Sequence, residues 1–232
     1  MKLLAIDTSG KVASAAVTDG SVLLAEKSVY TKLTHSQIIL PMVQQLLDDC
    51  GLALSELDGV VCAKGPGSYT GLRIGIAAVK GIVMGCESLK CAGVSTLEAL
   101  AWNSAAYRGS IISVMAARKG IIYLGVYSSD GERVVNISPD RVCPEEELSA
   151  LGFSEALITG DCCEYVKGKY FADKPNVKCA LPADRLQKAS ALCMAFEADP
   201  SIEVSADDLA AAYLQDTKAE KDKAHRADTD NR

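Results

Sequence analysis

The sequence predicts an α/β protein built from two units that lie side by side, each with its own mixed β-sheet. The main observation is that the order of three strands, a helix, a strand and a helix occurs twice along the 232 residues. Each repeat also contains a tight hairpin turn, at Asp19-Gly20 and at Asp130-Gly131. The chain is 49% hydrophobic but only 5% aromatic, so aliphatic side chains and alanine must fill a sizeable core.

The first predicted unit spans residues 1–108 and combines short apolar runs with segments whose apolar residues recur at helical spacing. Gly51 is expected to end the first helix, and Ser95 with Glu98 to form a capping box on the last one. The expected strands are 2–8, 12–17, 21–29, 59–63 and 90–94, and the expected helices are 34–50, 70–87 and 95–107.

The second predicted unit spans residues 109–217, and the polar segment 218–232 is expected to be disordered because it has no large apolar residue to bury. No sequence identity between the two units is visible, so the repeat concerns the order of elements alone. The expected strands are 111–115, 121–127, 133–137, 156–159 and 177–180, and the expected helices are 144–151, 161–167 and 184–196.

Charge and composition restrict the cellular setting. The net charge of −6 and the pI near 5.0 argue against a chain that grips a polyanion unaided. The N-terminal apolar run is too short for a signal peptide and is interrupted by Asp7, and no run reaches the roughly 18 apolar residues of a membrane span. The nine cysteines show no C-x-x-C spacing and are expected to be small buried hydrophobes in a reducing compartment. We therefore expect a cytoplasmic protein with no membrane contact.

The most informative segment is 65–75, which reads GPGSYTGLRIG. Its first three residues force a turn directly after a buried strand. Ser68 or Thr70 is then placed to cap the following helix. A glycine-rich turn before a helix can bind an anion, but the phosphate-loop pattern is absent because Leu72 stands where that pattern requires lysine.

The helix that follows carries small residues on one side and three internal glycines, each of which costs roughly 1 kcal/mol relative to alanine. The small-residue stripe has two interpretations. Another helix of the same chain covers it, which is the commoner fate of an apolar face, or it is a subunit interface. The stripe consists of Gly71, Gly75, Ala78, Ile82 and Gly85.

Catalytic signals are weak. A metallopeptidase or related metal-dependent transferase needs two histidines about one helical turn apart, whereas this chain has only His35 and, in the polar tail, His225. No serine lies in a G-x-S-x-G motif, and no cysteine has a histidine close in sequence. We therefore expect no catalytic residues, no cofactor and no metal.

A phosphate site of low specificity remains as an alternative. Candidate contacts lie at the end of the first strand, at Asp7, Thr8 and Ser9, and in the second half at Asp161, just after the expected strand 156–159, but no glycine pair for an adenosine pocket follows. The alternative function is a weak nucleotide-dependent phosphotransferase or ATPase that uses Asp7 and Asp161. A third interpretation is a self-associating structural protein.

Residues 65–81, which read GPGSYTGLRIGIAAVKG, resemble the most recognisable stretch of the TsaB (YeaZ) family. Further similarity covers most of the chain and is weaker between about 140 and 205. Ala116 stands where the family often has an acid, and Gln215 where it has arginine. The other matching segments are LLAIDTSGKVASAAV at 3–17, residues 34–36 with 40–41, residues 117–118 with 122–127, and residues 211–220.

The resemblance implies the sugar kinase/Hsp70/actin (ASKHA) fold with two ribonuclease-H-like units. It also implies a non-catalytic partner and activator of TsaD, the paralogous transferase that forms threonylcarbamoyladenosine next to the tRNA anticodon. A small ATPase, TsaE, joins the pair, and tRNA is reached only through the complex. A homodimer through the same helix is a further expectation. The implied partner interface is Gly71, Leu72, Gly75, Ala78, Ile82 and Gly85.

Overall fold

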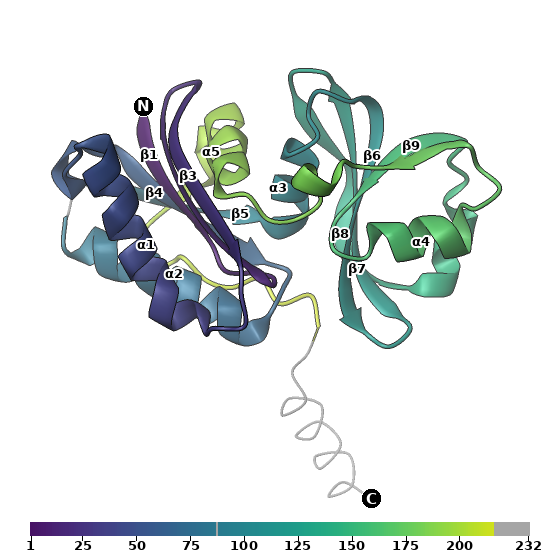
Figure 1. Ribbon diagram of the computed structural model, residues 1–232, viewed down its shortest axis with the longest axis horizontal. Helices are drawn as coiled ribbons and strands as arrows, with labels where there is room; N and C mark the ends of the chain where they lie inside the picture. Colours follow the sequence, from purple (N-terminus) through teal and green to yellow (C-terminus); the bar gives the residue numbers. More distant parts are fainter. Residues whose placement is uncertain (87, 216–232) are drawn as a thin grey trace, which may run out of the picture.

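The structure, a computed structural model, describes residues 1–86 and 88–215, and the segment 218–232 that we expect to be disordered lies outside the described residues. Two β-sheets stand side by side as two lobes, with helices both between and outside them (Figure 1). The prediction of an α/β protein with two mixed sheets is confirmed.

The first sheet has the strand order β11-β5-β4-β1-β2-β3. Strands β1, β4 and β5 are parallel, because helical crossovers connect them, whereas β1, β2 and β3 form an antiparallel meander through tight turns. Helices α1 (His35–Cys50) and α2 (Tyr69–Met84) cover one face, and α5 (Ala189–Ala198) covers the other. The strands are β1 (Lys2–Asp7), β2 (Val12–Asp19), β3 (Val22–Tyr30), β4 (Gly59–Gly65), β5 (Lys90–Ser95) and β11 (Glu203–Val204).

The second sheet repeats the meander followed by parallel strands, in the order β10-β9-β6-β7-β8. Helix α3 (Thr96–Trp102) packs on one face, and α4 (Cys163–Tyr170) with the 3-10 helix η2 (Glu145–Leu151) packs on the other. The strands are β6 (Arg108–Arg118), β7 (Ile121–Asp130), β8 (Val134–Pro144), β9 (Glu155–Thr159) and β10 (Asn176–Cys179).

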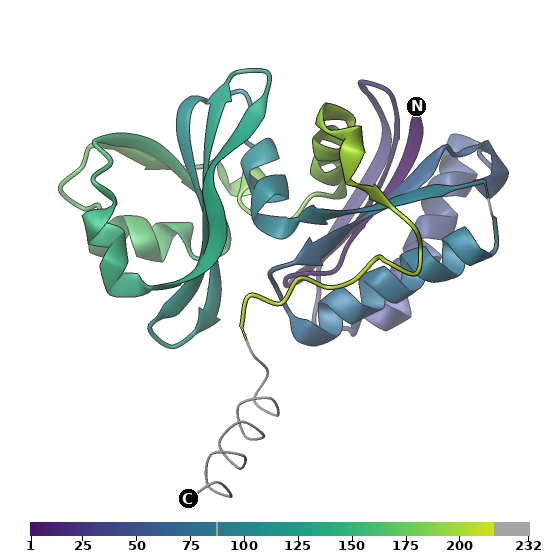
Figure 2. The same ribbon diagram turned by 180° about the vertical axis from the view of Figure 1, so that it is seen from behind.

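The lobes of the structure differ from the predicted units 1–108 and 109–217, because each unit contributes elements that pack on the sheet of the other. Helix α5 and strand β11 follow the second sheet in sequence but pack on the first sheet, while α3 lies against β6 and β7 of the second (Figures 1 and 2). The physical reason is that α5 is apolar on nearly all sides, so it is buried between the first sheet and α3. The chain therefore crosses between the lobes twice.

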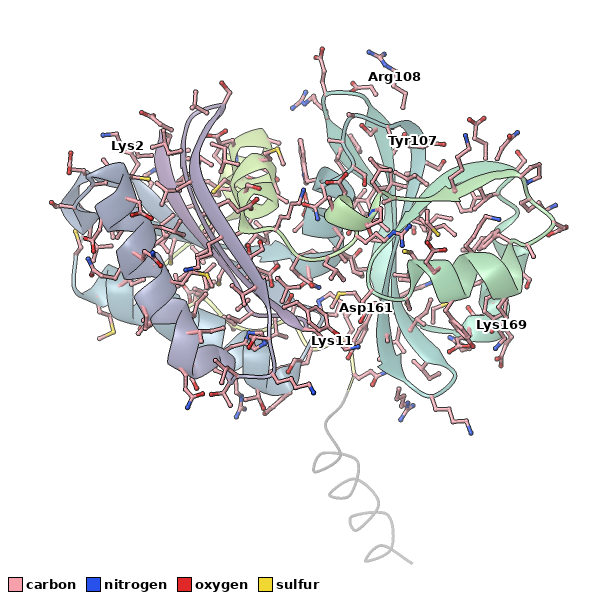
Figure 3. All side chains as sticks on the ribbon, in the orientation of Figure 1. Lys2, Lys11, Tyr107, Arg108, Asp161 and Lys169 are labelled. Carbon is pink, nitrogen blue, oxygen red and sulfur yellow. The ribbon has the colours of Figure 1, made fainter. Side chains whose placement is uncertain are left out.

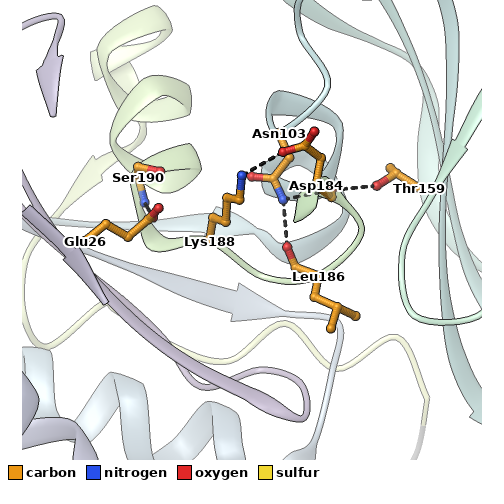
Figure 4. Close-up of polar contacts among 7 residues, drawn as sticks. All are labelled: Glu26, Asn103, Thr159, Asp184, Leu186, Lys188 and Ser190. Atoms are coloured by element: carbon orange, nitrogen blue, oxygen red, sulfur yellow. Dashed lines mark hydrogen bonds and ion pairs between the residues drawn. The ribbon is translucent and has the colours of Figure 1, made fainter. Parts of the chain in front are cut away.

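Polar contacts fix the second crossing, residues 182–190, along its length (Figure 4). The Asn103 side chain donates to the carbonyl oxygens of Leu186 at 2.8 Å and Asp184 at 3.4 Å. Lys188 forms an ion pair with the Asp184 carboxylate at 2.7 Å. Because these contacts engage the backbone before α5, the helix begins at Ala189 rather than at the predicted position 184.

Most local predictions agree with the structure. Gly51 ends α1 in the left-handed conformation with φ 63°, and the Ser95 hydroxyl accepts the amides of Leu97 and Glu98 at the start of α3. All nine cysteines are free, and five of them are buried. Among the described residues, no helix combines the length and hydrophobicity that a membrane span requires. Three further 3-10 turns are η1 (Leu54–Glu56), η3 (Pro182–Asp184) and η4 (Pro200–Ile202).

A carboxylate from the second sheet links it to the junction of β5 and α3. Asp140 accepts hydrogen bonds from the hydroxyls of Ser95 and Tyr127, the latter at 2.6 Å. Burial raises the pKa of Asp140, and the two hydrogen bonds oppose this shift. Burial, with Asp140 as its neighbour, raises the pKa of Tyr127 well above its ordinary range, so the phenol remains a donor.

Replacing Tyr127 with phenylalanine should lower the free energy of unfolding by about 1–3 kcal/mol, because Asp140 loses a donor in a buried setting. For a chain of this size the melting temperature should fall by roughly 2–4 °C per kcal/mol, which calorimetry can measure. The matched control is Tyr30→Phe, since Tyr30 is 66% exposed. Equal melting temperatures for the two variants would contradict this role for Asp140.

Candidate functional site

The segment 65–75 forms a sharp turn that places α2 beside the end of β1. Gly65 has φ 124°, and a Cβ there would lie 2.5 Å from the carbonyl oxygen of Ala212, so only glycine fits. The hydroxyl of Ser68 accepts the amide of Gly71 at 3.2 Å and caps the helix. Of the two capping residues considered from the sequence, the structure selects Ser68.

The N-terminal half of α2 lies directly against Thr8. The Thr8 hydroxyl donates to the carbonyl oxygen of Gly71 at 2.7 Å, and a Cβ on Gly71 would collide with the Thr8 carbonyl oxygen. A Cβ on Gly75 would lie 2.6 Å from Thr8 Oγ1. Leu72 is also buried. Gly71, Leu72 and Gly75 therefore make internal contacts within the chain.

The C-terminal half of α2 is different, because its small side chains are open to solvent. Nothing lies within 4 Å of a Cβ built on Gly81, and Gly85 is exposed. With α1 and η1 this half borders a groove of about 590 Å³, and none of the described residues that line it is charged. The groove residues are Leu40, Leu54, Ser55, Ala77, Ala78, Gly81, Ile82, Gly85 and Cys86.

We call this set the α1–α2 groove. It contains three of the predicted interface residues, Ala78, Ile82 and Gly85, and adds others that sequence reasoning missed. Leu40 could have been found from the sequence, because it is an apolar residue outside the helical stripe of α1 that faces the core. In the structure it is 50% exposed. Leu54 had no comparable signal, because its 3-10 turn was not predicted.

The predicted phosphate contacts at the end of β1 are also largely internal. Asp7 Oδ1 accepts the Ser9 amide at 2.8 Å and the Ser9 hydroxyl at 2.6 Å, while Asp7 Oδ2 has no partner. Full burial raises the pKa of Asp7 from 3.8 to about 6, against the lowering effect of Ser9. The Thr8 hydroxyl is hydrogen-bonded to the carbonyl oxygen of Gly71. Thr8 therefore fixes the contact between β1 and α2, and Asp7 orders the neighbouring Ser9.

A second cavity, of about 550 Å³, opens between the lobes and has Ser9 and Asp161 in its lining. We call it the interlobe cleft. The structure thus brings together one predicted contact from each half, and Asp161 Oδ1 accepts the amide of Ala116 at 2.8 Å. Lys11 lies opposite Asp161 at the cleft (Figure 3). Asp7 and Thr8 are not among the lining residues.

Neither histidine contributes to a metal site in the described part of the chain. Residues 1–86 and 88–215 contain no group of three or more histidine, cysteine or acidic side chains that could hold a metal ion. His35 lines the interlobe cleft, and partial burial lowers its pKa. His225 lies outside the described residues.

The sequence and the fold both match known proteins. Residues 29–231 match the family model described as TsaD, tRNA N6-adenosine threonylcarbamoyltransferase. The tRNA threonylcarbamoyladenosine biosynthesis protein TsaB of Haemophilus influenzae is 31% identical over 176 residues, which are 69% of this chain and 72% of that protein. The chain belongs to the TsaB family. It also lies within the wider TsaD family that the model describes.

Two further TsaB proteins align over shorter stretches. The Bacillus subtilis protein is 38% identical over 141 residues, and the alignment covers 61% of this chain and 61% of that protein. The Escherichia coli protein is 36% identical over 132 residues, which make up 56% of each chain. The matched part thus spans less than two thirds of the length of these two relatives.

Solved structures support the same family and fold. YeaZ from Pseudomonas aeruginosa superposes with a TM-score of 0.78 at 26% identity, over 92% of this chain and 99% of that one. The (R)-2-hydroxyglutaryl-CoA dehydratase component A of Acidaminococcus fermentans shares the fold, with a TM-score of 0.50 at 10% identity, over 84% of this chain and 97% of that one. The predicted ASKHA fold is confirmed.

The raised pKa of Asp7 predicts a pH-dependent stability. Because the Asp7 carboxyl binds a proton more tightly in the folded state than in the unfolded chain, its contribution to stability is complete below pH 3.8 and is lost as the pH rises to about 6. The loss amounts to about 3 kcal/mol. Asp7→Asn should remove this dependence and be more stable than wild type at pH 8, as measured by urea unfolding at several pH values. A variant with unchanged pH dependence would contradict the assignment to Asp7.

The contact between α2 and Thr8 predicts that Gly75→Leu destabilises the isolated chain. The new side chain would overlap Thr8, and overpacking of this kind costs about 1–3 kcal/mol or more. Gly81→Leu is the matched control, because it has open space and gains up to about 1 kcal/mol of helix propensity. Thermal unfolding should therefore rank Gly81→Leu at or above wild type and Gly75→Leu several degrees below. The reverse order would show that Gly75 faces solvent.

Proposed function

We propose that this chain is a non-catalytic subunit that binds and activates TsaD, the transferase that forms threonylcarbamoyladenosine next to the anticodon of tRNA in the cytoplasm. The observation that carries the proposal is the α1–α2 groove. The described residues of its lining are uncharged and mostly apolar, and small residues along α2 predominate among them. Small residues let a second helix approach closely, which is how helical interfaces reach short interaxial distances.

Family membership supports TsaD as the occupant. The relatives are named for threonylcarbamoyladenosine biosynthesis, and the matching family model describes TsaD itself. A partner of the same fold has helices equivalent to α1 and α2. If these helices packed against α1 and α2 of this chain, the groove of each protein would be buried. The chain's net charge of −6 supports an arrangement in which tRNA is bound mainly by the complex, which TsaE also joins.

The buried state of Asp7 supports a role without catalysis. A carboxylate that acts on a phosphate or on a metal must reach the ligand, whereas Asp7 is fully buried and bonded to Ser9. The phosphotransferase alternative would depend on Asp161 and Ser9 in the interlobe cleft, and Asp161 Oδ1 is bonded to the Ala116 amide. These contacts favour a scaffold over an ATPase.

The same groove can also accept a second copy of the chain, since an exposed apolar face of this kind promotes self-association. A homodimer would then form when TsaD is absent and dissociate when TsaD binds. The two assemblies compete for Ala78, Gly81 and Ile82, so one substitution should weaken both.

The test is Gly81→Arg. The long charged side chain would fill the groove, and burying it against a partner should weaken binding of TsaD by roughly ten- to a hundred-fold, which corresponds to about 1.4–2.8 kcal/mol. The isolated chain should keep its melting temperature, because arginine is a better helix former than glycine. Titration calorimetry with purified TsaD measures the affinity, and a transfer assay to tRNA measures the activation.

Gly168→Arg is the matched control. Gly168 is also inside a helix, α4, and also has nothing within 4 Å of its built Cβ, but it lies on the far lobe. The control should bind and activate TsaD as wild type does. If Gly81→Arg behaves like the control, the groove is not the TsaD-binding surface.

A further inference from the structure

An exposed stacked pair of tyrosines lies where the C-terminal segment of the first lobe meets α2. The rings of Tyr69 and Tyr213 stack with centroids 4.6 Å apart and planes 25° apart. The guanidinium of Arg73 lies 4.1 Å from the Tyr69 ring centroid and donates to both phenol oxygens. The two tyrosines remain 39% and 41% exposed, so part of their surface faces solvent.

The pair adjoins the mouth of the interlobe cleft. Ser68, which precedes Tyr69, lines the cleft and its amide donates to the Ser9 carbonyl oxygen at 2.7 Å. A third tyrosine, Tyr30, lines the same cleft and is 66% exposed. Tyr30 lines the cleft, Tyr69 follows the lining residue Ser68, and Tyr213 stacks on Tyr69. Of the four tyrosines that are more than a third exposed in the described residues, Tyr165 alone has no such link to the cleft.

Cationic side chains accompany these rings. Lys11 and Lys32 are exposed and line the cleft from the first lobe, and Arg73 extends the set along α2. Among the described residues that line the cleft, Asp161 is the only acid, and one of its oxygens already accepts the Ala116 amide. In a chain with 30 acidic and 24 basic residues, this local excess of positive charge runs against the overall composition.

We propose that these residues form a contact surface for single-stranded RNA, which we call the Tyr–Lys strip. Its members are Lys11, Tyr30, Lys32, Tyr69, Arg73 and Tyr213. The lysines neutralise backbone phosphates, and the exposed tyrosine faces stack with unpaired bases. The proposal rests on the proposed function for the identity of the RNA, an unpaired segment of the tRNA that the complex modifies.

The geometry favours a single strand over a duplex. Stacking on Tyr213 requires a base that has left its own stack, which unpaired loop nucleotides supply readily and duplex bases do not. The strip has only three cationic side chains. The isolated chain should therefore bind RNA weakly, with an affinity that falls as the salt concentration rises. Weak binding agrees with a subunit that contributes to a larger RNA surface.

The experiment uses the purified full-length chain and a fluorescein-labelled single-stranded RNA of about ten nucleotides, followed by anisotropy at several salt concentrations. Lys11→Gln with Lys32→Gln should lower the slope of log affinity against log salt by about 1.4, since each phosphate contact contributes about 0.7 for a single strand. Lys174→Gln with Lys178→Gln removes the same charge from the far lobe and is the matched control, which should retain the wild-type slope.

Tyr213→Ala should weaken RNA binding at least about fivefold, and Tyr213→Phe should restore it, because the ring rather than the hydroxyl carries the stacking. The phenylalanine variant also separates stacking from the hydrogen bond to Arg73. Thermal unfolding of both variants checks that the fold is retained.

Four outcomes would overturn the proposal: no anisotropy change at low salt, equal slopes for the two lysine double variants, equal affinity for a duplex of the same sequence, or equal competition by poly-glutamate, which would indicate an acidic-peptide site. TsaD affinity measured on the same preparations separates this inference from the proposed function. The strip variants should bind TsaD normally, whereas Gly81→Arg should bind RNA normally.

Discussion

The close approach of α2 to the end of β1 is the contact on which the rest of the structure depends. Thr8 bonds to the backbone of Gly71, and Gly75 leaves room for the Thr8 side chain. This contact fixes the direction in which α2 leaves the sheet, so its first half is buried and its second half faces solvent. Asp7, the neighbour of Thr8, is fully buried, and this burial raises the pKa of its carboxyl group. Both the exposure of the proposed partner surface and the burial of Asp7 accompany this one tight helix–strand contact.

The two lobes are held together by elements that each sequence half lends to the other. Helix α5 returns to the first sheet, and α3 packs against it and the second sheet, so the lobes share a helical layer. Asp140 adds a polar link between β8 and the start of α3 through Ser95. Because the lobes are connected in this way, the side chains at the mouth of the interlobe cleft keep a defined arrangement, which the proposed RNA contact requires.

The sequence predicted most strands and helices because their apolar periods and turn residues are local signals, as Gly51 and Ser95 illustrate. It did not predict that α5 belongs to the first lobe, since this depends on long-range packing. The available signal was the nearly all-apolar segment from Ala189 to Phe196, which is typical of a helix that is covered on more than one side. The small-residue stripe was read as one surface. Only the structure divides it, because glycine spacing does not show whether the facing atoms belong to Thr8 or to a partner.

In the proposed complex the two halves of α2 have different roles: the first half packs against the end of β1, and the second half binds TsaD. Hydrogen exchange of the chain, measured with and without TsaD, tests this most directly because it reports on each backbone segment separately. Exchange should be slow at residues 71–76 in both states, and TsaD binding should add protection only at the exposed half of α2 and the neighbouring surface of α1. Protection that appears instead around the interlobe cleft or on the second lobe, with α2 unchanged, would contradict these separate roles.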